Sequence, residues 1–563
     1  MNTQKWTETN WRRVSQRVAK LQHTIYSESL KDNSHGVRKL QKILVASNSA
    51  RLLAVRKVTQ DNRGKNTPGI DGIKTLTAQK RLNLSKELKI DGKASPIRRV
   101  WIPKPGRTEK RPLGIPTIGD RAKQALAKMA LEPEWEAKFE ANSYGFRPGR
   151  SCHDAIEAIY LSINKASQGK YVLDADISKC FDSIDHEALI DKLNTWPKMR
   201  MQIRAWLKAG VLNARGVEFP NAGTPQGGVI SPLLSNIALH GLENHLKQWI
   251  QNCDVKSKTG SNLNTQSKIT SLTLVRYADD FVVLHKDLWV VKAAKDRIDL
   301  WLSKMGLKLN EAKSRIAHTN KDHLEQKPGF EFLGFSIRKR PVGKYSRGKL
   351  ALKDKTIIVP ARASIKNHLK TIKAKLKTCS GTEVVISTLN PIIRGWCNYY
   401  ATVMSRRTFE RCRRQTYEML MAWGQRKHAS RTRAWVYNTY FLRAPKRKVF
   451  AFKRGDEIIR LVYHHAIKIA RHVKVQGTRS PYDGNMAYWG YRLQKRMGLS
   501  KTVQILLRVQ KNACAWCQLP FSTVDILEVD HILPKSQGGK NSLNNLQLLH
   551  GHCHDLKHGS KNS

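Results

Sequence analysis

The segment LTLVRYADDFVVL, residues 272–284, has an apolar run on each side of a short polar centre. Runs of this length that are rich in Val, Leu and Phe predict two strands, and the polar centre predicts a hairpin turn between them. Two adjacent carboxylates, Asp279 and Asp280, stand at that turn. Because two carboxylates beside a buried hairpin are costly unless a cation meets them, the segment predicts a cation-binding site.

A second acidic pair ends another apolar run, upstream of the first. YVLDADI, residues 171–177, predicts a strand that finishes at Asp174 and Asp176. Carboxylates at the ends of neighbouring strands can converge on one site and hold two Mg²⁺ ions, an arrangement that serves in-line phosphoryl transfer. The alternative, in which each aspartate only marks a turn, explains a single residue well but explains two such clusters poorly.

The charge of the chain indicates a polyanionic partner. Lys and Arg total 101 against 44 Asp and Glu among 563 residues, a formal net charge of +57. Nucleic acid is the expected polyanion, because each phosphate that is neutralised releases counterions. A membrane partner is not expected, since there is neither a basic amphipathic helix with a bulky apolar face nor an apolar run of about 18 residues. The absence of a secretion-like segment at residues 1–13 favours an intracellular protein, and so does the single close cysteine pair.

The pattern of the sequence changes along the chain. Residues 1–100 favour helices, and from about 100 to 340 short apolar runs alternate with helical patterns, which predicts a mixed sheet covered by helices. Beyond about 345 basic helices follow, with Ile365, Leu369, Ile372 and Leu376 as one apolar stripe. Residues 401–480 hold 20 Lys or Arg against 4 Asp or Glu, and aromatic residues interleave with them. That combination favours contacts to phosphates and exposed bases, although aromatic rings in helices are also common core residues.

Paired metal-ligand residues occur towards the end of the sequence. Cys514 and Cys517 form one pair, and His550 and Cys553 form another in the string HGHC. Two pairs at this separation fit one tetrahedral structural Zn²⁺ site, which a segment too short for a large core would need. His552 lies beside His550, so either histidine could be the fourth ligand.

Seven strings occur in the order that one protein family has. They are RPLGIPT at 111–117, YGFRPGRSCHDAI at 144–156, DADISKCFDSIDH at 174–186, GTPQGGVISPLLSNI at 223–237, YADD at 277–280, LNEAKS at 309–314 and FLGF at 332–335. With IIRGWCNYY at 392–400, they make the chain resemble a bacterial group II intron-encoded reverse transcriptase and maturase. Residues 506–563 resemble the HNH endonuclease domain found on many of these proteins.

The resemblance implies roles for residues of a polymerase site. Asp176 and Asp279, together with Asp280, would hold two Mg²⁺ ions. Phe181 would lie beneath the sugar of the incoming nucleotide, where its ring would exclude a 2′-hydroxyl by steric clash.

Further residues of that site would contact the nucleotide. Gln226 and the glycines beside it would allow close approach to the template–nucleotide pair. Lys104 and Arg111 would bind the incoming triphosphate, with ordinary surface charge as the alternative for these two.

The resemblance also implies roles in a nuclease site. His531 would activate a water, while Asp530 and His554 would hold one Mg²⁺ against the scissile phosphate. Asn545 would orient His531 or the substrate, with Asn541 and Asn544 as the alternatives. A purely structural zinc module that only binds nucleic acid is the alternative for the whole segment, and the Asp-His pair with His554 argues against it.

The expected fold is multidomain, α/β and α: a right-hand polymerase with fingers, palm and helical thumb, followed by a small zinc-stabilised ββα-metal nuclease. The expected boundaries are 1–100 for an N-terminal extension and the start of the fingers, 101–345 for the reverse transcriptase fingers and palm, 346–445 for the thumb or maturase domain, 446–505 for a DNA-binding linker and 506–563 for the HNH domain.

The expected partners are the intron RNA, a target DNA and deoxynucleotide triphosphates, in a bacterial cytoplasm. The nuclease would nick DNA, and the exposed 3′-hydroxyl would prime copying of the intron. One alternative is an RNA-binding splicing cofactor with inactive catalysis, against which the intact Asp176 and Asp279 argue. Another is a host-defence or diversity-generating reverse transcriptase, against which the nuclease and maturase-like segments argue.

Overall fold

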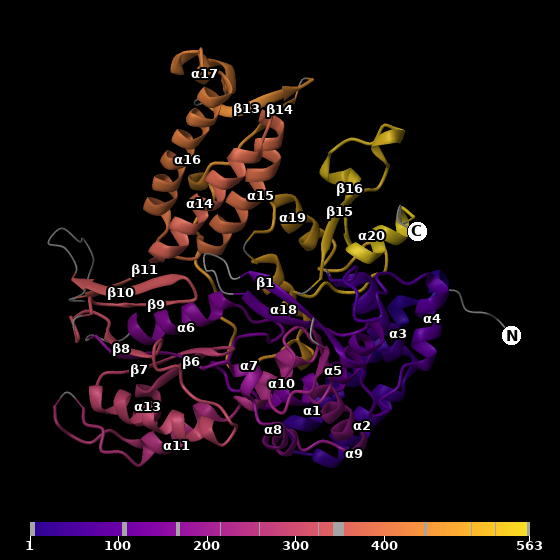
Figure 1. The fold of residues 1–563 in the computed structure, drawn as a ribbon, viewed down its shortest axis with the longest axis vertical. Coiled ribbons are helices and arrows are strands. Elements are labelled where there is room, and N and C mark those ends of the chain that lie inside the picture. Colours follow the sequence, from indigo (N-terminus) through magenta and orange to yellow (C-terminus); the bar gives the residue numbers. More distant parts are fainter. Residues whose placement is uncertain are drawn as a thin grey trace. The chain divides into compact units, whose positions relative to one another are not determined.

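The computed structural model describes residues 6–62, 64–103, 110–164, 169–213, 216–257, 259–324, 326–341, 354–443, 448–455, 457–496, 498–523 and 525–559. The chain divides into two compact units, and each is described by itself. Unit 1 comprises Met1–Ala155, Leu173–Arg315 and Val475–Ser563, and unit 2 comprises Ile156–Val172 and Ile316–Lys474. Figure 1 labels the helices and strands of both units.

Unit 1 begins with packed helices, as the first hundred residues predict. After the short turn η1 (Trp6–Glu8) come α1 (Trp11–Leu30), α2 (Ser34–Ala46), α3 (Asn48–Arg56), the short π-helical turn η2 (Lys57–Asp61), α4 (Ala78–Glu87) and the long α5 (Ile118–Lys138). Val14, Val18 and Ile25 of α1 recur at helical spacing and are buried, and α1 packs against α5. The apolar stripe of one helix therefore supplies the first part of the core.

The hairpin predicted at 272–284 forms β6 (Thr273–Tyr277) and β7 (Asp280–His285). These strands pair antiparallel, with Tyr277 opposite Asp280, so that Ala278 and Asp279 form the turn. They belong to a four-stranded sheet in the order β6-β7-β3-β8, with β3 at Tyr171–Asp176 and β8 at Arg315–His318. The central residues of β6 and β7 are buried, because helices cover this sheet.

The remaining elements of this part of unit 1 are helices and a second sheet. The helices are α7 (Cys180–Ser183), α8 (His186–Leu193), α9 (Pro197–Leu207), α10 (Ser231–Ala238), α11 (Leu242–Gln251), α12 (Thr265–Ser271) and α13 (Leu288–Ser303). A second four-stranded sheet has the order β2-β1-β4-β5, from β1 (Ile97–Pro103), β2 (Lys110–Ile115), β4 (Val211–Asn213) and β5 (Gly216–Glu218). The mixed sheets and helices predicted from about 100 to 340 are thus present.

The last part of unit 1 has a small core of its own. It contains η4 (Pro481–Asp483), α18 (Met486–Gln494), α19 (Lys501–Val509), β15 (Leu527–His531), η5 (Lys535–Gln537), η6 (Leu543–Asn545), β16 (Leu546–His550) and α20 (Gly551–Lys557). β15 and β16 pair antiparallel, and α20 packs on both strands. The core consists of Leu493, Leu506, Leu507, Cys514, Phe521, Leu548, Leu549 and Cys553. Two cysteines in so small a core agree with a segment held together partly by metal.

Unit 2 combines helices with two three-stranded sheets. Its elements are α6 (Cys152–Asn164), β9 (Phe330–Phe332), β10 (Phe335–Pro341), β11 (Asp354–Pro360), α14 (Arg362–Thr378), α15 (Thr382–Tyr400), α16 (Arg406–Lys427), α17 (Arg433–Tyr440), β12 (Phe441–Arg443), β13 (Lys448–Arg454), β14 (Glu457–Arg460) and η3 (His464–Ala466). The sheets have the orders β11-β10-β9 and β12-β13-β14. α14 packs beside both α15 and α16, and Figure 1 shows the three helices running together.

Candidate polymerase and nuclease sites

The turn between β6 and β7 has an unusual backbone. Ala278 adopts a φ of 57°, in the left-handed region that two-residue hairpin turns use. The segment before it in the chain, residues 142–145, lies along the same turn: the amide of Tyr144 donates to the carbonyl of Arg276 at 2.9 Å. A Cβ on Gly145 would lie 2.3 Å from the nitrogen of Ala278. Gly145 is therefore required by the close approach of the two backbones.

Three carboxylates meet at this turn. Asp279 lies in the turn, Asp280 begins β7 and Asp176 ends β3. Burial raises the pKa of Asp279, and the neighbouring Asp176 carboxylate adds to the rise. Burial, followed by the charges of Asp279 and Asp176, raises the pKa of Asp280 to about 7. Because Asp176 acts on both of the others, the three carboxylates share one site.

Two basic side chains form ion pairs with aspartates at this site. Lys313, which lies within the motif LNEAKS just before β8, forms an ion pair with Asp176, and Arg315 lies 3.1 Å from Asp174. The charge of Lys313 also lowers the pKa of Asp279 and Asp280, but it does not offset their rise. Carboxylate oxygens are the ligands that Mg²⁺ prefers, and the repulsion between these carboxylates would be relieved by a bound cation. The residues therefore fit divalent ions.

Phe181, Gln226 and Arg111, which are expected to contact a nucleotide, lie among the described residues. Phe181, on the short α7, is half-buried, and its ring lies 6.2 Å from that of Phe146, edge to face. The amide of Gln226 donates to both oxygens of Asp182, next to Phe181, at 3.3 Å. Arg111 is exposed on β2, and its charge lowers the pKa of Asp279. Lys104 lies outside the described residues.

Sequence reasoning overlooked one ring at this place. Phe146 has a positive φ of 59° and is half exposed beside Phe181, so the two rings together form an aromatic surface. The string YGFRPGR carries part of the family resemblance, but no pattern in it distinguishes an exposed phenylalanine from a core residue.

The four residues expected to bind Zn²⁺ come together in unit 1. Their ligand atoms, from Cys514, Cys517, His550 and Cys553, all lie within 4.8 Å of one another. Nδ1 of His550 lies 3.4 Å from Sγ of Cys517 and 4.0 Å from Sγ of Cys553, while its Nε2 lies 3.5 Å from Asp525.

The neighbouring histidine faces elsewhere. Nδ1 of His552 lies 3.5 Å from Asp61 of η2, and burial lowers the pKa of His552 to about 3. Of the two histidines that the sequence left open, His550 is the one beside the thiols. The set of three thiols and one imidazole fits a tetrahedral Zn²⁺ ion.

A second group of possible metal ligands lies between β15 and α20. It consists of Asp530, His554 and His558, whose ligand atoms also lie within 4.8 Å of one another. Burial alone would raise the pKa of Asp530, but hydrogen bonds from Lys557, His558 and Gln547 lower it to about 2. Sequence reasoning missed His558, although its spacing from His554 by one helical turn could have suggested it.

His531 does not face the residue that the sequence favoured. Its Nε2 lies 2.7 Å from Oδ1 of Asn541. The side chain of Asn545 instead holds the intervening loop, since it accepts from the amide of Leu533 at 2.9 Å and donates to the carbonyls of Leu533 and Lys540. Asn544 forms part of η6.

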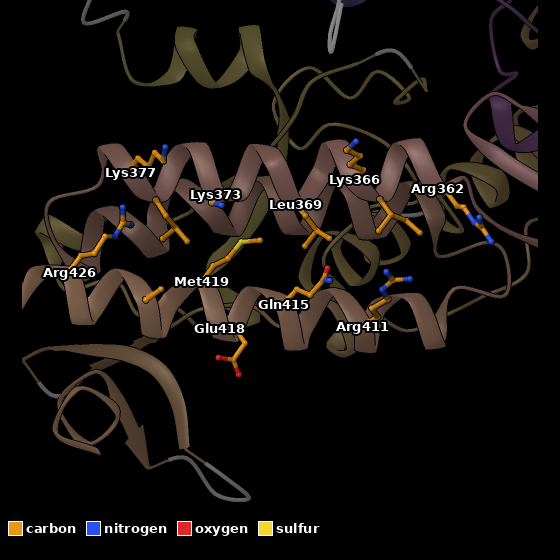
Figure 2. Close-up of a pocket in the computed structure, with 13 residues that line it drawn as sticks. Arg362, Lys366, Leu369, Lys373, Lys377, Arg411, Gln415, Glu418, Met419 and Arg426 are labelled. Atoms are coloured by element: carbon orange, nitrogen blue, oxygen red, sulfur yellow. The ribbon is translucent and has the colours of Figure 1, made fainter. Parts of the chain in front are cut away.

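Unit 2 carries a groove between two helices. It has a volume of about 1020 Å³ and lies between α14 and α16, where Figure 2 shows Leu369 and Met419 pointing into the gap. Its basic residues are Arg362, Lys366, Lys373, Lys377, Arg411 and Arg426. The acidic Glu418 is paired with Arg433 at 2.7 Å. The groove is therefore strongly electropositive.

The aromatic residues of IIRGWCNYY pack inside unit 2. Trp396 stacks on His368 with ring centres 4.3 Å apart, and Tyr399 stacks on Phe335 at 5.2 Å. Tyr400 donates a hydrogen bond to Gly334. These contacts stabilise the unit, while Trp396 and Tyr399 stay partly exposed and line a cavity of about 600 Å³. Within the described part of the chain, no helix has the length and hydropathy that crossing a bilayer requires.

Four known protein families match successive segments of the chain. They are the N-terminal domain of reverse transcriptase at 6–88, reverse transcriptase (RNA-dependent DNA polymerase) at 102–337, the group II intron maturase-specific domain at 362–441 and the HNH endonuclease at 514–560. The order is that of a group II intron-encoded reverse transcriptase and maturase. The chain belongs to this family. It is accordingly an RNA-directed DNA polymerase and maturase with an HNH endonuclease domain at its C-terminal side.

Individual relatives agree with this membership. The group II intron-encoded protein LtrA of Lactococcus lactis subsp. cremoris is 31% identical over 415 residues, which cover 60% of this chain and 66% of LtrA. Protein YkfC of Escherichia coli is 33% identical over 350 residues, covering 57% of this chain and 89% of YkfC. Maturase-like protein 1 of Euglena gracilis is 27% identical over 403 residues, covering 69% of this chain and 76% of the relative.

Proposed function

We propose that this group II intron protein binds its intron RNA, assists splicing, nicks a DNA target and copies the intron from the nick, in a bacterial cytoplasm. The observation that carries the polymerase step is the convergence of Asp176, Asp279 and Asp280: burial, and then the charges of the neighbouring carboxylates, raise the pKa of Asp279 and of Asp280. Two Mg²⁺ ions bound there would lower the pKa of the primer 3′-hydroxyl and stabilise the leaving pyrophosphate. The family membership supports the same chemistry.

The other residues of the polymerase site act on the nucleotide. Phe181, beside Phe146, is the proposed barrier to a 2′-hydroxyl, because a ring at this position excludes the larger sugar by contact. Arg111 and Lys104 are the proposed contacts to the triphosphate, and the nearness of Arg111 to Asp279 supports the first of these. Gln226, which faces Asp182, is proposed to support the base pair being formed.

The nuclease step is assigned to the second metal group. One divalent ion held by Asp530 and His554 would stabilise charge on the scissile phosphate. His531 is the proposed general base: the amide oxygen of Asn541 only accepts, so Nε2 of His531 carries a proton and Nδ1 is free to take one from water. Asn545 is proposed to act indirectly, by holding the loop that carries Asn541. Zn²⁺ at the four-residue cluster is proposed to be structural.

Intron RNA is the proposed ligand of the basic surface in unit 2. Six basic residues line the groove of α14 and α16, and its one acidic residue is already neutralised by Arg433. Contacts to phosphates supply most of the affinity of such a surface and make it sensitive to salt. The match to the maturase-specific domain over 362–441 supports this assignment.

One reconstitution tests the whole sequence of steps. The full chain is mixed with RNA transcribed from the region around its own reading frame and then with duplex DNA that contains the spliced exon junction. We expect splicing, a nick in one DNA strand and complementary DNA joined to that nick. A chain that copies RNA only from an added primer and never from the nick would contradict the coupling of the two active sites.

A further inference from the structure

The two oxygens of Asp530 have different surroundings. Oδ2 accepts from Nε2 of Gln547 at 3.0 Å and from Nζ of Lys557 at 2.6 Å. Oδ1 lies 2.8 Å from Nε2 of His558 and 3.8 Å from Nε2 of His554. One oxygen is thus fixed by donors, and the other faces two imidazole nitrogens.

Glu528 contacts the ring nitrogen of His554 that lies away from Asp530. Nδ1 of His554 lies 2.9 Å from Oε2 of Glu528. A carboxylate only accepts, so Nδ1 carries the proton and the lone pair of Nε2 points towards Oδ1 of Asp530. Glu528 and Asp530 stand two residues apart on β15, so both project from the face that α20 covers.

The same helix brings a second imidazole to the site. His554 and His558 are four residues apart, so their side chains lie on the same face of α20 and its C-terminal end, with ring centres 4.6 Å apart. Three atoms from Asp530, His554 and His558 therefore converge within 4.8 Å. Exposed carboxylates and histidines often meet without an ion, but here one histidine is held in the ligating tautomer by a separate carboxylate.

We propose that His558 is a third protein ligand of the nuclease ion and that Glu528 is the positioning residue of His554. The inference rests on the proposed HNH function and deepens it. Two imidazoles and one carboxylate favour Mn²⁺ and other transition ions over Mg²⁺, which prefers oxygen ligands and keeps its water. The nuclease centre thus differs in ion preference from the all-carboxylate polymerase centre.

The test measures Mn²⁺ binding to the full chain by the electron paramagnetic resonance signal of free Mn²⁺. Asp279→Asn is present throughout, so that the polymerase site contributes little. We expect His558→Ala and Glu528→Ala each to weaken Mn²⁺ binding at the nuclease site by about tenfold or more. Glu528→Gln, whose amide oxygen can still accept from Nδ1, should recover part of that loss. Asp555→Asn, which removes an exposed carboxylate of α20 outside the cluster, is the charge-matched control and should bind as the parent does.

The possible outcomes distinguish failure of the His558 and Glu528 proposal from failure of the proposed nuclease function. If Asp530→Ala abolishes Mn²⁺ binding while His558→Ala binds as the parent does, the ion has no third ligand and the proposal fails with the nuclease assignment intact. If Asp530→Ala itself leaves binding unchanged, the nuclease assignment fails as well. Zinc content and melting temperature are measured for each variant, and equal values show that lost binding is not lost folding. A Glu528→Gln that behaves as Glu528→Ala would rule out the positioning role.

Discussion

Nε2 of His531 and Oδ1 of Asn541 lie 2.7 Å apart, and this pair sets which nitrogen of the histidine can act as a base. The loop that brings Asn541 to His531 is closed by Asn545 and passes close to Leu533. A Cβ on Gly539 would lie 1.9 Å from the carbonyl oxygen of Leu533, so the loop requires glycine there. The proposed nuclease base is therefore positioned by a loop as well as by its own strand.

Asn541→Ala should lower the rate of DNA nicking by about tenfold to a hundredfold, because His531 would lose the partner that fixes its tautomer. The measurement is single-turnover nicking of a plasmid across a pH series. Asn544→Ala, three residues after Asn541 in η6, serves as the matched variant. Equal loss in both variants would mean that the loop as a whole, and not the contact to His531, is responsible.

His531→Ala should eliminate nicking and leave extension of a supplied primer and assistance to splicing unaffected. The base and the Zn²⁺ cluster are separate, so the domain should stay folded. Cys514→Ser should differ, since losing a Zn²⁺ ligand should unfold this segment and weaken DNA contact. Nicking, DNA binding and zinc content are compared in both variants. Parental nicking by His531→Ala in Mg²⁺ would show that the segment is a zinc-stapled DNA-binding module.

Asp279→Ala should reduce primer extension on an RNA template by at least about a thousandfold and leave intron RNA binding nearly unchanged. The carboxylate is proposed to hold metal, whereas affinity for RNA should be spread over many basic residues. Extension assays are run beside filter binding. Retained polymerisation would remove Asp279 from the site.

Phe181→Ala and Phe181→Val should admit ribonucleotides far better than the parent. The half-buried ring beside Phe146 would no longer fill the space that a 2′-hydroxyl needs. Single-nucleotide incorporation with matched ribo- and deoxynucleotides measures the ratio. Phe146→Ala is the companion variant, and a change confined to it would move the barrier to the neighbouring ring.

Asp280→Asn should stabilise the metal-free protein in alkaline buffer. The pKa of Asp280 rises from 3.8 to about 7 on folding, so the folded state holds an extra proton between these values and loses stability as the pH rises through them. Because Asp280 is partly exposed at the tip of the hairpin, the gain at pH 8 should be about 1 kcal/mol. Melting curves without added divalent ion should show a much smaller gain at pH 5. An equal gain at both pH values would indicate better packing as the cause.

The convergence of the candidate polymerase carboxylates could be predicted from the sequence because the features that place them are local. The alternation that places Asp279 and Asp280 at a turn, and the strand that ends at Asp176, are visible in short strings. The partners of the nuclease residues could not be predicted in the same way. Asn541 reaches His531 only through a loop closed by Asn545, and composition does not specify the path of a loop.

Two basic residues illustrate the same limit. Lys313 lies within a string that the sequence singled out, yet its ion pair with Asp176 depends on how the segment after α13 returns to β3. His558 stands one helical turn after His554, a spacing that could have suggested it, but its contact with Asp530 depends on how α20 packs against β15. Side-chain partners that are distant in sequence thus required the fold.

The close contact between Gly145 and Ala278 means that the residues tolerated at these two positions depend on each other. A residue larger than glycine at 145 fits only if the backbone at Ala278 moves, and a β-branched residue at the left-handed position 278 would be strained. The residue at one position therefore limits which substitutions the other tolerates, although neither residue is proposed to take part in the reaction. Among descendants of this protein, the two positions should be lost together when polymerisation is no longer selected, and retained together where it is.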